Sequence, residues 1–443
     1  MPVNPYPENQ VTMDRAHGQL RTSLDELLPQ VNLPKQAHNR GKLQQPWTVL
    51  LTGSTGSLGT NILASLQGLP ASKLGRIYCL NRSEDAADRQ AASLSAHQSL
   101  DRSRVAFLRG DFEDVTFGLD PEILAKLLAE VNLIIHCAWP VDFLAPLESF
   151  CPHLDRLRDL CRFACSSPHH PPVLFLSSLG IAYASDNFTV PEAVPDDFST
   201  ISGGYSQSKY VAERMVQEYA DSTSLPAAVL RLGQLAGPVR SAGVWPHREW
   251  FPTLLRASKH IGALPASLGH QNVIDWVPLD IASQIIVELA DYVLEFNSHD
   301  AGRFLLFNIV NPRPVPWSCV LAHLGDVARA STESQHWVKM LRGSLARDAS
   351  TPGRRLIGFY EKLFEPGRMI YTVHRRNLLA GSRTARGLRP ANKEWLLRWL
   401  DQWGYRNDGR EIQPQRATRP DVQPVQVQMQ ASGARISGIK AKL

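Results

Sequence analysis

A tyrosine and a lysine four residues apart carry the clearest acid–base chemistry in this sequence. Tyr205 and Lys209 open a stretch with helical spacing, YSQSKYVAERMVQEYA, and residues four apart lie on one face of a helix. A free tyrosine has a pKa of about 10 and transfers protons poorly near neutral pH. A nearby ammonium favours the phenolate and lowers that pKa, so the pair predicts proton transfer at a carbonyl oxygen.

A hydroxyl group at the end of an apolar run would complete such a site. The run VLFLSS ends in Ser177 and Ser178, upstream of the tyrosine. Adjacent residues of a strand point to opposite faces, so only one of the two serines can reach the pair. That serine would donate a hydrogen bond to an oxygen on which charge develops. A tyrosine–lysine pair standing alone is more often an ordinary surface pair of a helix, so the neighbouring motifs decide its meaning.

The segment TGSTGSLG joins an apolar run to a stretch with helical spacing. A tight turn needs glycine where φ is positive and where the backbone approaches a pyrophosphate. The helix that follows directs free N–H groups at phosphate oxygens. This strand–turn–helix context predicts a dinucleotide site, and a tight turn without a ligand is the alternative. We expect cofactor contacts along the whole turn, which comprises Thr52, Gly53, Ser54, Thr55, Gly56, Ser57, Leu58 and Gly59.

The end of the second apolar run bears on the choice of cofactor. An acidic residue at this point would bind a ribose 2′-hydroxyl, whereas the sequence has Asn81 and Arg82. An arginine can pair with a 2′-phosphate, which favours NADPH. Glu84 and Asp85 follow closely, so a surface role for Arg82 is the alternative.

Apolar runs alternate with helical patterns through the first half of the chain. This alternation is typical of the α/β class, here a Rossmann-type doubly wound parallel sheet covered on both faces. After about residue 238 the alternation weakens, and Gly, Pro and Trp become frequent. The predicted strands are 47–53, 76–82, 105–111, 131–138, 173–178 and 227–233. The predicted regions are an N-terminal extension (1–45), an NADP-binding Rossmann domain (46–238), mainly a substrate-binding lobe (239–405) and a disordered basic tail (406–443).

Composition argues against several functional classes. Of the net charge of +5, residues 406–443 supply +4, from seven basic against three acidic residues, so no broad nucleic-acid-binding face is expected elsewhere. No apolar run reaches the roughly 18 residues of a membrane span, and the first twenty residues lack a secretory pattern. The six cysteines include no Cys-x-x-Cys pair, so we expect buried thiols in a reducing compartment and no metal site.

The spacing Gly-x-x-Gly-x-x-Gly, followed by Tyr-x-x-x-Lys, resembles the short-chain dehydrogenase superfamily. Several blocks resemble a narrower group, the male-sterility-like thioester reductase domains of fungal nonribosomal-peptide-synthetase-like carboxylate reductases and of polyketide synthases. The blocks are IIHCAWPVDF, GGYSQSKYVAER, RLGQLAGP, VWPHREWFPTLLRASKHIGALPASLG and VIDWVPLDIASQIIVELA. The resemblance implies that Ser178, Tyr205 and Lys209 form the catalytic set of an extended short-chain dehydrogenase.

The same resemblance assigns further cofactor contacts. Asp111 and Phe112, after the third run, resemble the pair that flanks adenine in this superfamily. Cys137 stands where an asparagine is common, and we expect Cys137 and Ala138 to pack beside the nicotinamide. Tyr205 and Lys209 are also expected to contact the cofactor, since the lysine can hold the nicotinamide ribose.

Domains of this group reduce an acyl thioester on the phosphopantetheine arm of a carrier protein to an aldehyde, and some members continue to the alcohol. This implies an NADPH-dependent reductase of secondary-metabolite biosynthesis. The 45 residues before the sheet cannot hold a carrier module, so we expect a carrier supplied in trans or a small acyl thioester or carbonyl substrate. One alternative is a reductase of a free aldehyde or ketone, and another is a non-enzymatic NADP-sensing regulator.

Basic residues of the second lobe suggest where a carrier would dock. Arg240, Arg248, Arg256 and Lys259 accompany a single acid, Glu249. Carrier domains commonly dock through acidic helices, and such an edge would steer them. An ordinary solvated helix face is the alternative.

The last three residues bear on location. They are Ala441, Lys442 and Leu443, a tripeptide similar to the peroxisomal Ser-Lys-Leu address. A chance match in a basic tail is the alternative. We therefore expect a cytoplasmic or a peroxisomal protein.

Overall fold

The structure is a computed structural model of the 443-residue chain. It describes residues 46–93, 99–111, 113–143, 145–184, 189–195, 201, 203–241, 243–297, 304–365 and 372–405. Phe112, the N-terminal extension (1–45), the basic tail (406–443) and its final tripeptide Ala441–Leu443 lie outside the described residues. Among the described residues, no helix is both long and apolar enough to cross a membrane.

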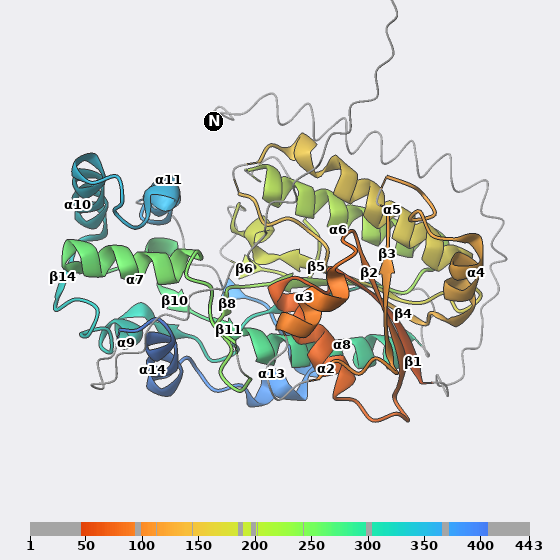
Figure 1. The fold of residues 1–443 in the computed structure, drawn as a ribbon. Coiled ribbons are helices and arrows are strands. Elements are labelled where there is room, and N and C mark those ends of the chain that lie inside the picture. Colours follow the sequence, from red (N-terminus) through yellow and green to blue (C-terminus); the bar gives the residue numbers. More distant parts are fainter. Residues whose placement is uncertain are drawn as a thin grey trace, which may run out of the picture. The chain divides into compact units, whose positions relative to one another are not determined.

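Seven parallel strands form one sheet at the centre of the described chain (Figure 1). Their order is β12-β7-β5-β4-β1-β2-β3, so β4 is the central strand and β1 lies beside it. The chain fills one half of the sheet and then crosses β1 to fill the other, which is the doubly wound arrangement predicted from the sequence. The strands are β1 (Trp47–Thr52), β2 (Leu74–Asn81), β3 (Val105–Arg109), β4 (Leu133–His136), β5 (Val173–Ser178), β7 (Ala227–Leu232) and β12 (Phe304–Ile309).

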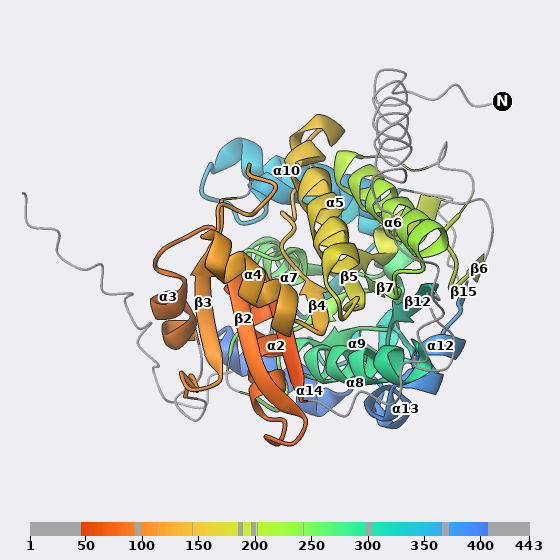
Figure 2. The same ribbon diagram turned by 90° about the vertical axis from the view of Figure 1, so that its right-hand side faces the viewer.

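Helices cover both faces of this sheet because its strands are apolar on both sides. In β1, Val49 and Leu51 belong to one hydrophobic cluster and Leu50 belongs to the other. The first cluster includes α2 (Ser57–Gln67) and α8 (Leu279–Asn297). Figure 2 shows these two helices on the opposite side of the strands from α4 (Pro121–Glu130), α5 (Cys151–Ser166) and α6 (Gly204–Thr223). The continuous apolar runs of the sequence are thus explained by burial on both faces.

The last strand of the sheet and one of its covering helices come from beyond residue 238. Strand β12 pairs in register with β7, and α8 packs against α2. Both lie within 239–405, the region that the sequence assigned mainly to the substrate lobe. The sheet therefore extends past that boundary, and the lobe is interrupted in sequence by the elements that complete the sheet.

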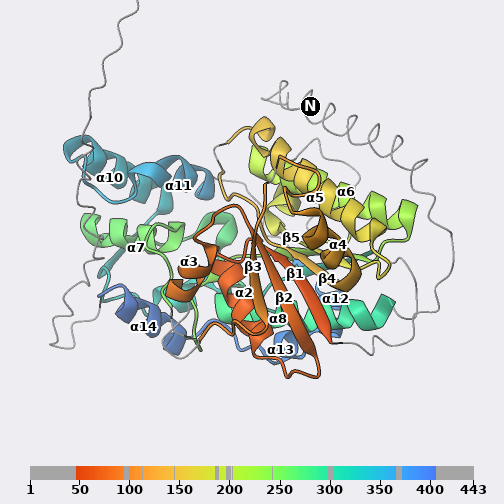
Figure 3. The same cartoon turned by 45° about the vertical axis from the view of Figure 1, so that its right-hand side comes forward.

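Most of the rest of that region forms a lobe beyond one end of the strands (Figure 3), whereas α12 (Arg376–Gly381) packs against β12 and α13 (Arg383–Gly387) packs against α8. The core of the lobe is aromatic: Trp245 packs on Phe251, Trp276, Trp399 and Trp403, with ring centroids 5.0–5.6 Å apart.

The remaining helices are α3 (Ala86–Ser93), α7 (Trp250–Ile261), α9 (Trp317–Leu321), α10 (Ser334–Arg347), α11 (Ile357–Leu363) and α14 (Lys393–Gln402). The short strands are β6 (Thr189–Val190), β8 (Leu235–Ala236), β9 (Ala263–Pro265), β10 (Val273–Ile274), β11 (Val277–Pro278), β13 (Val315–Pro316), β14 (Ala330–Thr332) and β15 (Thr372–Val373).

Candidate active site

The glycine turn between β1 and α2 leaves no room for side chains at two of its three glycines. Gly53 has a φ of +72°, and a Cβ there would lie 2.7 Å from the backbone nitrogen of Ala138. A Cβ on Gly59 would lie 2.0 Å from the carbonyl oxygen of Gly53. Gly56 differs, because it is exposed and a Cβ there would meet only that same oxygen, at 3.4 Å. The first and third glycines therefore shape the turn, and the second leaves its outer surface open.

This turn suits the phosphates of a dinucleotide. Gly56 is the N-cap residue of α2, and no side chain caps the N–H groups at this end of the helix. The exposed residues Gly56 and Ser57 therefore surround a helix N-terminus whose N–H groups favour an anion. The buried Ser54 hydroxyl donates to Asn81 Oδ1 at 3.1 Å and fixes the turn against the end of β2. The residues present fit a bound pyrophosphate at the open side of the turn.

Threonine and histidine side chains join β1 to β4 beneath the turn. Thr52 Oγ1 lies 2.7 Å from His136 Nδ1, and the Ala138 N–H donates to the same threonine oxygen at 3.4 Å. Burial lowers the pKa of His136 to about 3, so its ring is neutral. Cys137 follows directly, and burial raises the pKa of its thiol to about 11. The segment expected beside the nicotinamide is thus uncharged and held against the glycine turn.

Arg82 is exposed immediately after β2, and the two acids near it have other partners. Glu84 forms an ion pair with Arg109, and Asp85 accepts a hydrogen bond from the Ser83 hydroxyl. Asn81 is buried, so its side chain supports the turn and Arg82 is the group free to meet a ligand. Asp111, beyond β3, is exposed as well. Phe112, the other residue expected at the adenine, lies outside the described residues.

The two serines at the end of β5 point to opposite faces, as strand geometry requires. Ser177 donates to Glu213 Oε1 at 2.6 Å, and Glu213 is buried in an ion pair with Arg231. Ser178 Oγ accepts the Gly180 N–H at 3.1 Å and is close enough to the phenol of Tyr205 to lower its pKa. Ser178 is therefore the serine that the structure brings to the tyrosine.

Tyr205 lies in the first turn of α6 with its side chain 8% exposed. The rings of Phe143 and Phe150 pack edge-on against it, at centroid distances of 5.0 and 6.1 Å. Burial raises the pKa of the phenol to about 12; the hydrogen bond to Ser178 lowers it, and Cys137 raises it. At neutral pH the phenol carries its proton, so it can act as a general acid.

Lys209 lies one turn along α6, on the same face, and is 3% exposed. Its Nζ donates to the carbonyl oxygen of Leu176 at 2.6 Å. The same atom lies 4.4 Å from the ring centroid of Trp139 and 4.5 Å from that of Phe175. Burial lowers the pKa of Lys209 to about 7, against the opposing influence of Cys137 and Glu213.

The expected lowering of the Tyr205 pKa by Lys209 is wrong for this arrangement. Both side chains are almost fully buried, and burial opposes whichever form is charged. The tyrosine is therefore held as a neutral phenol, and the lysine is close to losing its proton. Such a pair favours proton donation to a developing oxyanion over proton removal from an alcohol.

The structure adds two residues to which the sequence assigned no role. His136 orients Thr52 below the glycine turn, and Trp139 forms one wall around the ammonium of Lys209. Their partners are about 70 to 84 positions away in sequence, so no local spacing could reveal these contacts. The block IIHCAWPVDF carried the family resemblance of this segment, but it did not indicate what these two side chains contact.

The basic residues of the second lobe differ in their surroundings. The backbone N–H of Arg240 donates to Asp280, and its guanidinium donates to Gln284 at 3.2 Å. Burial raises the pKa of Glu249, which accepts a hydrogen bond from the indole of Trp245. Other basic residues border a cavity of about 630 Å³, which is lined by His247, Arg256, Lys259, His260, Pro352, Trp403, Gly404 and Tyr405.

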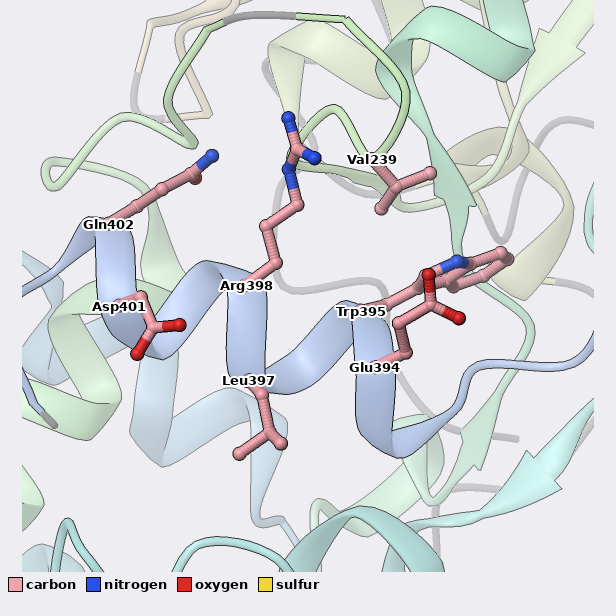
Figure 4. A pocket seen from close by; sticks show the side chains of 7 residues that line it. All are labelled: Val239, Glu394, Trp395, Leu397, Arg398, Asp401 and Gln402. Atoms are coloured by element: carbon pink, nitrogen blue, oxygen red, sulfur yellow. The ribbon is translucent and has the colours of Figure 1, made fainter.

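A second cavity, of about 500 Å³, lies beside α14 (Figure 4). Arg398 donates to the carbonyl oxygen of Ser241, and Gln402 donates to that of Gly243, so the helix holds the loop that follows β8. This cavity contains none of the residues proposed for catalysis. It is lined by Val239, Glu394, Trp395, Leu397, Arg398, Asp401 and Gln402.

A family model described as "Male sterility protein", an NAD-binding domain, matches residues 51–286. The chain is 31% identical over 410 residues to a carboxylic acid reductase of Neurospora crassa, covering 90% of this chain and 38% of that protein. It is 35% identical over 339 residues to an adenylate-forming reductase of Heterobasidion annosum, covering 72% of this chain and 30% of the relative. The chain thus spans well under half the length of these relatives.

Solved structures show the same fold. The terminal R domain of the myxalamid biosynthetic pathway has a TM-score of 0.68 at 24% identity, covering 82% of this chain and 93% of that one. A reductase domain of a nonribosomal peptide synthetase from Mycobacterium tuberculosis has a TM-score of 0.66 at 21% identity, covering 85% and 95%. At these identities the likeness concerns the fold alone.

Proposed function

The chain belongs to the male sterility protein family, and on that premise we propose that it is an NADPH-dependent reductase of acyl thioesters in secondary-metabolite biosynthesis. The observation that carries the proposal is the position of Ser178 beside the phenol of Tyr205, whose pKa it lowers, with Lys209 one helical turn away. Strand order reverses between β4 and β1. Ser178 ends β5 on one side of this crossing point, and the glycine turn follows β1 on the other side. Ligands of doubly wound sheets bind at this crossing.

The chain's own residues would divide the work as follows. A nicotinamide cofactor supplies a hydride when it is bound. Tyr205 donates its proton to the carbonyl oxygen of the substrate, and Ser178 donates a hydrogen bond to the same oxygen as negative charge develops there. Addition of a hydride and a proton to a thioester gives a hemithioacetal. Cleavage of its carbon–sulfur bond then releases an aldehyde and a thiol.

We propose NADPH as the preferred cofactor because of Arg82. Its guanidinium is exposed at the end of β2, and both nearby acids are engaged elsewhere. A planar guanidinium forms strong, directional hydrogen bonds with a phosphate. The 2′-phosphate distinguishes NADPH from NADH, so Arg82 would discriminate between them.

We propose that the acyl group arrives on a carrier protein and that the basic surface of α7 guides docking. Arg248 and Arg256 are exposed, and Glu249 is turned inward to Trp245. Among the described residues, no acidic side chain lines the cavity that Arg256 and Lys259 border. Exposed cations of this kind raise the rate of association with an acidic partner.

The proposed activity is tested by following NADPH oxidation with three substrates carrying the same acyl chain. These are a carrier-bound thioester, an acyl-coenzyme A and the free aldehyde, each assayed with trapping of aldehyde and measurement of released thiol. We expect stoichiometric aldehyde and thiol from at least one thioester. Turnover of the aldehyde alone would instead identify a reductase of free carbonyl compounds, and no turnover with any substrate would favour an NADP-sensing regulator.

A further inference from the structure

The ammonium of Lys209 is surrounded by two aromatic rings and one carbonyl oxygen. Trp139 and Phe175 present their rings to Nζ at 4.4 and 4.5 Å, and Leu176 accepts its hydrogen bond at 2.6 Å. Within the part of the chain that the structure describes, no carboxylate forms an ion pair with this ammonium. The nearest candidate, Glu213, is already bound to Arg231.

We propose that Trp139 is a positioning residue of this site: the face of its indole holds the ammonium of Lys209 in place and in its charged form. The inference rests on the proposed reductase function, because it concerns how that site keeps its lysine protonated. A cation over an aromatic ring is attracted by the negative face of the ring, and tryptophan is the strongest partner. The attraction is larger in a desolvated site such as this one.

The indole is itself fixed by contacts to α6. Its Nε1 donates to Ser208 Oγ at 3.2 Å, and Ser208 Oγ donates to the carbonyl oxygen of Tyr205 at 2.7 Å. The ring also packs edge-on against Phe175, with centroids 5.4 Å apart, and lies tilted against His153 at 5.6 Å. Trp139 therefore connects the segment after β4 to the helix that bears both proposed catalytic residues. These neighbours fix the orientation of its ring.

The other groups that face Lys209 give it little help in keeping its proton. Burial keeps the ring of His136 neutral, with a pKa of about 3, and burial lowers the pKa of His153. Cys137 carries its proton at neutral pH, since burial raises its pKa to about 11. Glu213 favours the charged lysine but shares its charge with Arg231 and Ser177. The aromatic rings are therefore a major counterweight to burial.

Removal of the indole should lower the pKa of Lys209, since the charged form loses a favourable contact. An amine with a lower pKa loses its proton at a lower pH. In Trp139→Leu the alkaline limb of the kcat/KM profile should accordingly move down by about one pH unit. Trp139→Phe keeps an aromatic face, so its profile should shift much less than that of Trp139→Leu. If Trp139→Leu does not fold, Trp139→Phe alone should show a smaller shift in the same direction.

Trp47→Leu is the matched control. Trp47 is 5% exposed at the start of β1, and Lys73 lies over its ring at 5.0 Å. This variant removes a buried indole and a cation–aromatic pair at the opposite end of the strands from the site. It should lose thermal stability without any movement of the pH profile. An equal movement in both tryptophan variants would show a general effect of destabilisation and would overturn the proposal.

A second readout does not depend on turnover. The protonation of Lys209 can be followed by NMR of the full-length protein labelled with ¹³C and ¹⁵N lysine, with Lys209→Arg used to assign the signal. We expect a lower titration midpoint in Trp139→Leu than in the wild-type protein, and an unchanged midpoint in Trp47→Leu. An unchanged midpoint in Trp139→Leu overturns the inference. A wild-type protein without reductase activity whose midpoint still depends on Trp139 would refute the proposed function and leave the inference standing.

Discussion

Burial acts in opposite senses on the two titrating residues of the site. It raises the pKa of Tyr205 to about 12 and lowers that of Lys209 to about 7. The neutral phenol is the form needed to donate a proton. The ammonium is the form that can stabilise the phenolate left behind, and it becomes scarce as the pH rises past 7. Activity in the direction of reduction should therefore fall on the alkaline side, where the lysine loses its proton.

Removal of the phenol hydroxyl tests the assignment of Tyr205. In Tyr205→Phe the proton donor is lost, so turnover should fall by at least about a hundredfold. NADPH affinity, measured by fluorescence titration, should stay nearly unchanged. Tyr219→Phe is the control: Tyr219 lies on the same helix, is 3% exposed, and its hydroxyl has no hydrogen-bond partner among the described residues. Turnover close to normal in Tyr205→Phe would rule out this mechanism.

Reversal of the charge at Arg82 tests the choice of cofactor. Arg82→Asp removes one charge-assisted contact with a 2′-phosphate and introduces repulsion. The affinity for NADPH should fall at least about tenfold, whereas that for NADH should change little. Arg102→Asp makes the same charge change at an exposed arginine before β3 and should affect neither cofactor. Equal losses for both cofactors in Arg82→Asp would refute the assignment.

Residue types and their order predicted the serine, tyrosine and lysine, and the structure brings these three together. Strand alternation also showed that Ser177 and Ser178 could not both serve. The protonation of the site was not predictable, because it depends on burial by residues such as Phe150 and Trp139 that are distant in sequence. The use of Trp139 as a wall for the lysine was hidden for the same reason.

The first and third glycines of the turn between β1 and α2 differ from the second in the space around them, so variants of Gly59 and Gly56 can be compared directly. A Cβ on Gly59 would lie 2.0 Å from a backbone oxygen that cannot move aside freely. Gly59→Ala should therefore destabilise the protein by about 2 kcal/mol or more, visible as a lower Tm, and should weaken cofactor binding as well. The strain here is in the folded backbone, so it does not depend on a ligand.

The contrasting variant is Gly56→Ala. Gly56 has a φ of −78°, which alanine adopts readily, and its Cβ would make only an ordinary contact. Its Tm should stay near that of the wild type, whereas NADPH affinity should fall because the new methyl group occupies the open side of the turn. A similar loss of stability in both variants would contradict the distinction drawn between the two glycines.

Six strands of the sheet lie within two residues of their predicted bounds, because each is a buried apolar run between polar segments. The seventh, β12, was not predicted. It follows a region where the alternation of strands and helices weakens, and parallel pairing with β7 leaves no local mark in the sequence. Helix α8 lies in a block that resembles the family, but its packing against α2 could not be foreseen for the same reason.

Carrier docking would involve the exposed basic residues of the second lobe. Arg248→Glu combined with Arg256→Glu should slow turnover of a carrier-bound thioester, more so at low salt, where charges are less screened. Turnover of a short pantetheine thioester should remain nearly unchanged. Arg102→Glu with Lys126→Glu gives the same change in net charge at exposed positions outside the lobe and should spare both substrates. If the Arg248→Glu, Arg256→Glu variant turns over both thioesters equally slowly, the proposed docking surface is wrong.

Strand β12 also determines when the sheet can be completed on the ribosome. Strand β7 ends at Leu232 and its edge partner begins at Phe304, about 70 residues later. At bacterial or eukaryotic elongation rates of about 5–20 residues per second, that edge of β7 waits for several seconds. An unpaired edge of a buried strand is prone to aggregate. Slower decoding between these two strands should therefore lower the yield of native protein, whereas slower decoding after residue 309 should not.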